Sequence, residues 1–157
     1  MMSRLREWSA RKKDSVAAFF IFIISCVTHL LYFGAPAGVV FDETYFLKFV
    51  GFYETGSYYF DIHPPLGKLI FLVFAHMIGV TPSIEIGNIG AALPPSLILL
   101  RLLPIVAGIL LPVVVYYLCR RLKLSALVSL AASILICFEN SLIVESRFVL
   151  MDSTLLL

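Results

Sequence analysis

The sequence predicts an all-α, polytopic membrane protein, and three observations lead to this fold class. Hydrophobic residues make up 61% of the 157 residues and charged residues only 14%, whereas soluble domains carry about a quarter charged residues. Residues 16–33 form an uncharged run of 18 residues, which at about 1.5 Å per residue roughly matches a hydrocarbon core of about 30 Å. Further apolar runs follow at 66–80, 97–119 and 124–144.

The first expected membrane helix covers residues 15–33. Its apolar core is longer than the roughly 7 to 15 residues of a signal-peptide core, so cleavage is not expected. Lys and Arg next to a membrane helix favour the cytoplasmic side, and this helix is preceded by Arg4, Arg6, Arg11, Lys12 and Lys13. We therefore expect residues 1–14 to be cytoplasmic and the helix to be an uncleaved signal anchor.

The second expected membrane helix covers 97–119 and is followed directly by the basic turn "RRLK", residues 120–123. The same charge rule keeps this turn in the cytoplasm, so the helix runs inward and residues 34–96 form a long outer loop. A third helix over 124–144 then returns to the outer face. A fourth begins within 148–157, so we expect the sequence to be the N-terminal portion of one longer transmembrane domain.

Two interfacial helices are expected within the outer loop. The apolar part of 66–80 is only about 10 residues long, which is typical of segments that lie at the membrane surface. Pro64 and Pro65 suit the first turn of a helix there. A short tilted span is the alternative. The aromatic-rich segment 41–53 also suits the interface, since aromatic rings are favoured at that depth.

Charge and cysteine content exclude several functions. The formal net charge of +2 is too small to indicate a nucleic-acid partner, and the cations cluster beside apolar runs, as membrane topology requires. The three cysteines lie in or beside apolar runs, where packing is the expected role. The sequence shows no ligand spacing of a metal site, no phosphate-binding glycine loop and no Ser-His-Asp arrangement.

The expected topology sorts the ionisable residues by side. Eight of the 12 Lys and Arg residues fall inside, and eight of the 10 acids fall at the outer face, so the chemistry is expected there. Asp42 and Glu43 are adjacent, and neighbouring residues of a helix point about 100° apart, which predicts different roles. Partial burial raises a carboxylate's pKa and makes it a better base. A solvated pair at a helix start is the alternative.

Arg101 lies within the apolar run "SLILLRLLPIVAG". A charge at membrane depth costs at least about 2.5 kcal/mol unless it is paired or reaches water, so a partner is expected. A guanidinium matches the geometry of a carboxylate, such as that of Asp42, or of the phosphate of a lipid-linked ligand. The alternative is a long side chain that extends to the interface.

Two further stretches bring polar residues to the outer face. "FDIHPPLGK" contains Asp61, His63 and Lys68, and a His at an interface can donate or relay a proton. "FENSLIVESRFVLMDS" contains Arg147 and Asp152, and its polar groups predict a cavity at the membrane rim. An ordinary charged loop explains Arg147 well, but it explains Asp152 less well, because Asp152 begins another apolar run.

Four stretches, in this order and spacing, carry a family resemblance: "VVFDETYFLKF", "YYFDIHPPLGKL", "LLRLLPIVAG" and "ENSLIVESRFVLMDSTLLL". From about residue 16 to 157 the sequence resembles the protein O-mannosyltransferases, which are polytopic glycosyltransferases of the GT-C superfamily. The resemblance implies transfer of mannose from a polyprenyl (dolichyl-type) phosphate to Ser or Thr hydroxyls of proteins, on the lumenal or extracytoplasmic side. A single displacement would invert the sugar's anomeric configuration.

The resemblance also implies residue roles. Asp42 would supply the catalytic base, Glu43 would assist at the acceptor site, and Arg101 would meet the donor phosphate. A polyprenyl phosphate is already a good leaving group, so no metal or cofactor beyond the lipid-linked donor is needed. The sequence departs from the family's usual pattern at Thr44 and Gly67, where Val and Ala are common. We expect the site to be lined by Asp61, His63, Lys68, Arg147 and Asp152.

Two other functions stay open at this point. A GT-C enzyme could move the same kind of sugar to a lipid or glycan, and a non-catalytic membrane subunit or transporter fragment could use the outer acids to bind ions. For the enzyme, the expected partners are the lipid donor, a protein acceptor and a second copy or homologue in a dimer. The expected location is the bacterial plasma membrane or the endoplasmic reticulum membrane, with the N-terminus in the cytoplasm.

Overall fold

Helices joined by loops make up the computed structural model, which describes the backbone from Met2 to Leu157 and the side chains from Lys12 onward. Within these residues the only β-pairing is a single bridge between Gly38 and Ala92. The helices are α1 (Met2–Leu30), α2 (Glu43–Thr55), α3 (Pro65–Met77), α4 (Pro95–Ile98), the 3-10 turn η1 (Leu99–Arg101), α5 (Leu102–Arg121), α6 (Ala126–Cys137), α7 (Asn140–Ser146) and α8 (Asp152–Leu156).

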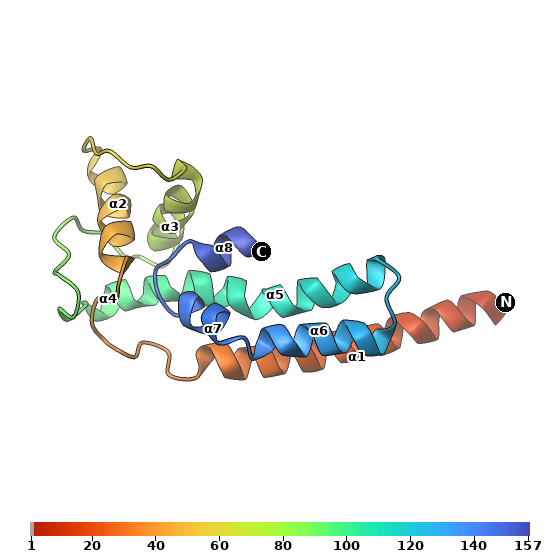
Figure 1. Cartoon of the computed structure of the whole chain (residues 1–157). Helices are drawn as coiled ribbons and strands as arrows, with labels where there is room; N and C mark the ends of the chain where they lie inside the picture. The colour runs from red at the N-terminus through yellow and green to blue at the C-terminus, as the bar shows by residue number, and fades with distance from the viewer. Residues whose placement is uncertain (1) are drawn as a thin grey trace.

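Two helical stretches are long and apolar enough to cross a membrane, Lys12–Leu30 with 19 residues and Pro95–Arg121 with 27. Together with α6 they form an elongated bundle (Figure 1). The central helix is α5, which packs against α1, α6, α7 and α8. The predicted helix over 97–119 lies within the second stretch, whereas the predicted helix over 15–33 extends three residues past the end of the first at Leu30. The expected cytoplasmic segment 1–14 falls mostly on residues whose side chains are not described.

The third expected helix, 124–144, is broken into α6 and α7, which meet at an angle of 55°. The break falls at Glu139, whose backbone is extended and whose carboxylate accepts a hydrogen bond from the N–H of Leu142 at 2.7 Å. A side chain that caps the start of a new helix in this way ends the previous one. Apolar periodicity continues across the break, so it does not reveal it.

Small residues let the bundle helices approach closely. A Cβ added at Gly108 of α5 would lie 2.6 Å from Cδ2 of His29 and 2.8 Å from Cβ of Ser146. On α6, the hydroxyls of Ser129 and Ser133 donate to the backbone carbonyls of Ser125 and Ser129, each at 2.9 Å, so neither hydroxyl needs a polar partner on another helix. Close backbone packing at small residues is characteristic of helices in membranes.

The predicted inner turn and the predicted outer loop lie at opposite ends of the bundle (Figure 1). At the end where α5 meets α6, the carboxylate of Asp14 accepts hydrogen bonds from Nε of Arg120 at 3.0 Å and from the hydroxyl of Tyr116 at 2.9 Å. Arg121 lies beside them. The opposite end carries α2 and α3. The basic turn and the crosswise helices are thus at opposite ends of the bundle, as the predicted topology requires. The side of the membrane on which each end lies stays a prediction.

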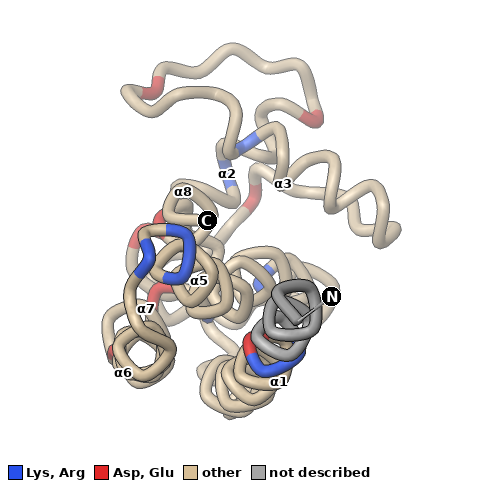
Figure 2. Tube along the Cα trace, turned by 90° about the vertical axis from the view of Figure 1, so that its right-hand side faces the viewer, with Lys and Arg blue, Asp and Glu red and all other residues tan. Residues whose placement is uncertain are grey.

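Helices α2 and α3 run crosswise to the long axis of the bundle, at one end of it (Figures 1 and 2). At 13 residues, α3 is about 20 Å long, too short to span a bilayer. One face is buried, with Phe71 and Ala75 in the core, whereas the other exposes Leu66, Ile70 and Val73. The crosswise placement favours the interfacial helix over the tilted span.

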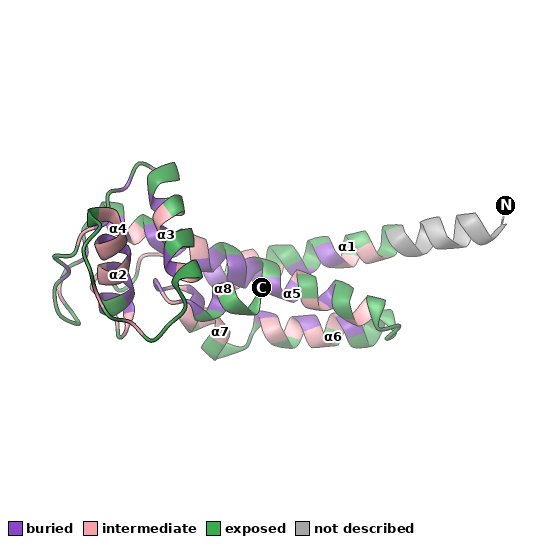
Figure 3. Cartoon of the chain, turned by 90° about the horizontal axis from the view of Figure 1, so that it is seen from above, coloured by how far each residue is buried: buried purple, intermediate pink, exposed green. Residues whose placement is uncertain are grey.

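The main hydrophobic core lies where these crosswise helices meet the bundle, as the buried residues in Figure 3 show. It joins side chains of the loop before α2, of α2, α3, α4 and η1, and of the loop before α8: Val39, Phe46, Leu47, Val50, Phe71, Ala75, Leu97, Leu100, Val149 and Met151. Both ends of the chain segment 36–101 therefore pack on one cluster. That cluster surrounds the polar residues described next.

Candidate functional site

A buried ion pair between Glu43 and Arg101 lies at the centre of this junction. Nε of Arg101 donates to Oε1 of Glu43 at 2.8 Å, and Nη2 donates to Oε2 at 2.7 Å. Both side chains are 0% exposed. Two parallel N–H···O bonds give the strongest geometry that this pair of groups can adopt.

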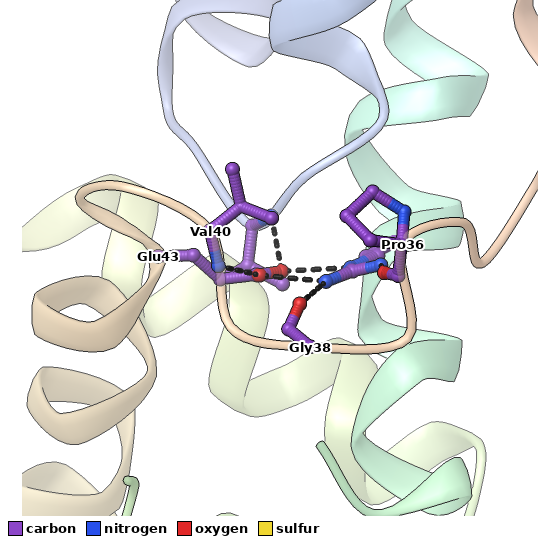
Figure 4. Close-up of polar contacts among 6 residues, drawn as sticks. Pro36, Gly38, Val40 and Glu43 are labelled. Atoms are coloured by element: carbon purple, nitrogen blue, oxygen red, sulfur yellow. Dashed lines mark hydrogen bonds and ion pairs between the residues drawn. The ribbon is translucent and has the colours of Figure 1, made fainter. Parts of the chain in front are cut away.

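The pair connects three segments that are far apart in the sequence (Figure 4). Glu43 also accepts hydrogen bonds from the backbone N–H groups of Val40 and Val149, each at 3.1 Å. Arg101 also donates to the carbonyl oxygens of Pro36 at 2.7 Å and Gly38 at 2.8 Å. The loop before α2, the start of α5 and the loop before α8 are therefore fixed to one another.

The partner expected for Arg101 is thus present, and it is Glu43, one residue after Asp42. The alternative in which Arg101 extends to the interface does not fit a fully buried guanidinium. The contact with a donor phosphate that the family resemblance implies stays a prediction. In the described residues the guanidinium is enclosed by Glu43, the two carbonyl groups and the ring of Phe148, whose centroid lies 4.9 Å from Cζ.

Asp42 has the opposite environment. It is half-buried, it precedes α2, and its carboxylate makes no hydrogen bond to that helix. It lines a cleft of about 450 Å³, here called the acidic cleft. Its walls also include His63, Glu145, Phe148 and Asp152. Three of the predicted site residues, Asp42, His63 and Asp152, are therefore brought together.

The backbone immediately before Asp42 is unusual. Phe41 has φ +46°, in the left-handed region, which a bulky residue adopts only at some energetic cost. The sharp turn directs Glu43 into the core while Asp42 stays at the cleft. Strained backbone of this kind concentrates at functional sites, where the surrounding structure enforces it.

Asp61, His63 and Lys68 form a second polar group beside the cleft. The Lys68 ammonium is buried, forms an ion pair with Asp61 and donates to the carbonyl oxygen of His63 at 2.9 Å. Nδ1 of His63 lies 2.8 Å from Oδ1 of Asp61. Burial raises the pKa of Asp61, but hydrogen bonds from Lys68 and His63 outweigh that effect and lower the pKa to about 2. Asp61 therefore stays ionised and orients His63, which lines the acidic cleft.

Arg147 is placed elsewhere. Its Nη2 donates to the carbonyl oxygen of Thr28 at 2.8 Å, so it joins the end of α1 to the end of α7. It does not line the acidic cleft, unlike its neighbours Glu145 and Phe148. The expectation that Arg147 lines the site stays a prediction, and its position at the end of α1 does not support it. Glu145 belongs to the same stretch, for which both a polar cavity and an ordinary charged loop were open, and it does line the acidic cleft.

No group of three or more His, Cys, Asp or Glu side chains within the described residues is arranged to hold a metal ion. Asp42 and Asp152 share the cleft with one histidine, His63, and Asp61 already engages that histidine. What the arrangement does offer is a free carboxylate beside an apolar wall. Such a group can accept a proton from a bound hydroxyl.

The fold places the chain among the polytopic GT-C glycosyltransferases. It is similar to the solved Saccharomyces cerevisiae protein O-mannosyltransferase Pmt1-Pmt2 complex bound to the sugar donor, with a TM-score of 0.86 and 29% identity over 92% of this chain. The model of the dolichyl-phosphate-mannose-protein mannosyltransferase family matches residues 19–157. The chain belongs to this family, which confirms the resemblance and the fold class predicted from the sequence.

Curated relatives agree. The chain is 32% identical over 148 residues to dolichyl-phosphate-mannose–protein mannosyltransferase 4 of Schizosaccharomyces pombe, covering 92% of this chain and 19% of the relative. It is 34% identical over 139 residues to protein O-mannosyltransferase 1 of Drosophila melanogaster, covering 87% of this chain and 16% of the relative. The chain thus spans about a fifth or less of the length of these relatives and 20% of the solved chain.

Proposed function

We propose that the complete protein containing this sequence transfers mannose from a polyprenyl (dolichyl-type) phosphate to Ser or Thr hydroxyls of proteins, with inversion, on the non-cytosolic side of the membrane. Family membership and the names of the relatives support the reaction. The observation that carries the proposal is the contrast between two adjacent acids. Glu43 is buried with its oxygens bonded, whereas Asp42 is left free at the acidic cleft.

In this reaction Asp42 acts as the general base. Its carboxylate takes the proton of the acceptor hydroxyl as that oxygen forms a bond to the anomeric carbon of mannose. The bond between that carbon and the phosphate oxygen breaks, and polyprenyl phosphate leaves with the electron pair. Attack opposite to the leaving group inverts the anomeric centre, and a positioned base typically contributes about 10² to 10⁴ in rate.

The structure supports a positioning role for Glu43 and Arg101. Their ion pair fixes the turn that presents Asp42 and the loop that carries Phe148 and Asp152, so the base and the opposite wall of the cleft keep a set separation. Asp61 and Lys68 orient His63, which places an imidazole on the same cleft. The family resemblance implies a direct contact between Arg101 and the donor phosphate. In this scheme Arg101 instead acts through Glu43, by fixing the turn that presents Asp42.

The complete protein also requires a membrane and a donor within it. The two apolar stretches of 19 and 27 residues support an integral membrane protein with several crossings. We propose that its N-terminus is cytoplasmic, which places the acidic cleft at the outer face. The similar solved structure is a complex of two homologues, and we propose a dimer for this protein as well.

The deciding experiment measures sugar transfer by the complete protein. Purified protein is incubated with labelled polyprenyl-phosphate mannose and a Ser-containing peptide, with wild type compared with Asp42→Asn. We expect a loss of about 100-fold or more in kcat, because the positioned base is removed. Unchanged transfer by Asp42→Asn would remove Asp42 as the base, and no transfer by wild type to either acceptor class would favour the ion-binding subunit. Label that appears only in lipid would favour a lipid or glycan acceptor.

A further inference from the structure

A second cleft adjoins the acidic cleft. It has a volume of about 470 Å³ and lies between the end of α2, the turn that follows it and the start of α3. We call it the aromatic cleft, because it is lined by Phe52, Tyr53, Tyr58 and Tyr59, together with polar side chains. His63 lines both clefts, so the two meet at that residue.

The rings of the aromatic cleft are fixed against one another. Tyr59 stacks on Phe49 and Phe52, with centroid separations of 5.1 and 5.2 Å and interplanar angles of 18°. It also meets the ring of Tyr53 edge-on at 5.4 Å. Rigid aromatic side chains give a large contact area and lose little conformational freedom when a ligand binds.

The charges of this cleft are internally balanced. Asp61 is paired with Lys68 and His63, and the Lys68 ammonium lies 5.4 Å from the centroid of the Phe49 ring. The cleft therefore offers no free charge to attract an ionic ligand. In contrast, Tyr58 is 92% exposed, which leaves a large ring open to a ligand of mixed apolar and polar character.

We propose that the aromatic cleft binds the segment of the acceptor polypeptide that flanks the modified Ser or Thr, through apolar side chains of that segment. The inference rests on the proposed function. An acceptor whose hydroxyl reaches Asp42 continues in both directions at about 3.3 Å per residue when extended. A few residues therefore cover the step past His63 into the neighbouring cleft. Alternate side chains of an extended chain point to the same side and can contact the rings.

The test compares two acceptor peptides with the same central Ser, one flanked by Leu and Val and the other by Gly. We expect wild-type complete protein to prefer the apolar-flanked peptide in kcat/KM by about two- to tenfold, the range expected for contact with one aromatic ring. Tyr58→Ala should reduce this ratio to about one. Because the Tyr58 side chain is almost fully exposed, its removal should not destabilise the fold, so a lower ratio would not be explained by unfolding.

The matched control is Tyr45→Ala. Tyr45 lies on α2, whereas Tyr58 lies in the turn that follows α2. Tyr45 is also largely exposed, at 57%, but it lines neither cleft, so the wild-type ratio should be kept. A wild-type ratio of one, or the same ratio in wild type and Tyr58→Ala, would overturn the inference. Because neither peptide carries charged flanking residues, screening by salt should not change the ratio.

Binding separates this inference from the proposed reaction. The affinity of a fluorescently labelled apolar-flanked peptide is measured with the complete protein without donor, in wild type and Tyr58→Ala. Weaker binding by Tyr58→Ala supports the cleft even if no sugar is transferred to either peptide, an outcome that would remove the proposed function alone. Equal binding would remove the cleft even if transfer to Ser is observed.

Discussion

Asp42 and Glu43 are adjacent carboxylates with opposite environments. Glu43 is fully buried, and its oxygens accept hydrogen bonds from Arg101 and from two backbone N–H groups. Asp42 is half-buried and lines the acidic cleft. The change in direction between consecutive residues at the start of a helix places Glu43 in the core and leaves Asp42 at the cleft. An acidic pair in a sequence therefore need not be a catalytic pair.

The largest expected effect on stability comes from Arg101→Ala. This change leaves the buried Glu43 carboxylate without its cation, and breaking a buried ion pair in this way costs about 3 to 5 kcal/mol. Asp42→Asn should change the unfolding free energy by about 1 kcal/mol or less, because only an interaction with the helix dipole is altered. Denaturant unfolding of the complete protein in detergent measures both. A comparable loss in both variants would show that Asp42 is also structural.

Arg101→Lys should have an intermediate effect and sharpens the comparison further. A lysine keeps the charge but loses the two parallel hydrogen bonds to Glu43, so we expect a stability loss of about 1 to 3 kcal/mol. We expect kcat to fall with stability, because the turn that presents Asp42 loosens. If Arg101 instead contacts the donor phosphate directly, the KM for the donor should rise while stability stays near that of wild type. Parallel kinetics and unfolding distinguish these outcomes.

The group around Asp61 predicts a pH dependence. Its pKa is lowered to about 2 from an ordinary value of 3.8, because hydrogen bonds from Lys68 and His63 outweigh the effect of burial. A lowered pKa in the folded state adds stability above the unfolded value, and this contribution is lost as the pH falls through the folded value. The stability difference between wild type and Asp61→Asn should therefore be constant above about pH 4 and should shrink toward pH 2. A difference that does not change with pH would show that Asp61 is not the titrating group.

The sequence was sufficient for the fold class and for the two long apolar helices, and its predicted site set included three of the four ionisable residues that line the acidic cleft. Composition and charge placement determine the fold class and the helices, because a bilayer imposes length and sidedness on any helix that crosses it. The requirement that Arg101 have a partner also followed from its position. Asp42, His63 and Asp152 were expected at one site, and the structure does bring them together.

The sequence could not assign Arg101 to Glu43 rather than to Asp42. That choice depends on the path of the loop before α2, which is fixed by contacts with a distant segment. The N–H of Val39 donates to the carbonyl of Ala91 at 2.8 Å, and the N–H of Leu93 donates to that of Ala37 at 2.9 Å. These backbone bonds leave no signature in the side chains. For the same reason the contact between Arg147 and the end of α1 was not foreseen.

The smallest expected effect concerns Phe41, whose left-handed backbone separates the environments of the two acids. Asn tolerates positive φ better than Phe does, and the Phe41 ring is 65% exposed, so Phe41→Asn should stabilise the fold by about 1 kcal/mol or less. The turn itself should persist, because the ion pair of Glu43 and Arg101 enforces it, and kcat should then stay within about twofold of wild type. Unfolding and transfer assays on the same preparation test both expectations. A clear loss of stability would mean that the exposed ring contributes packing that outweighs the strain, whereas a large loss of kcat at unchanged stability would mean that the ring itself shapes the cleft beside Asp42.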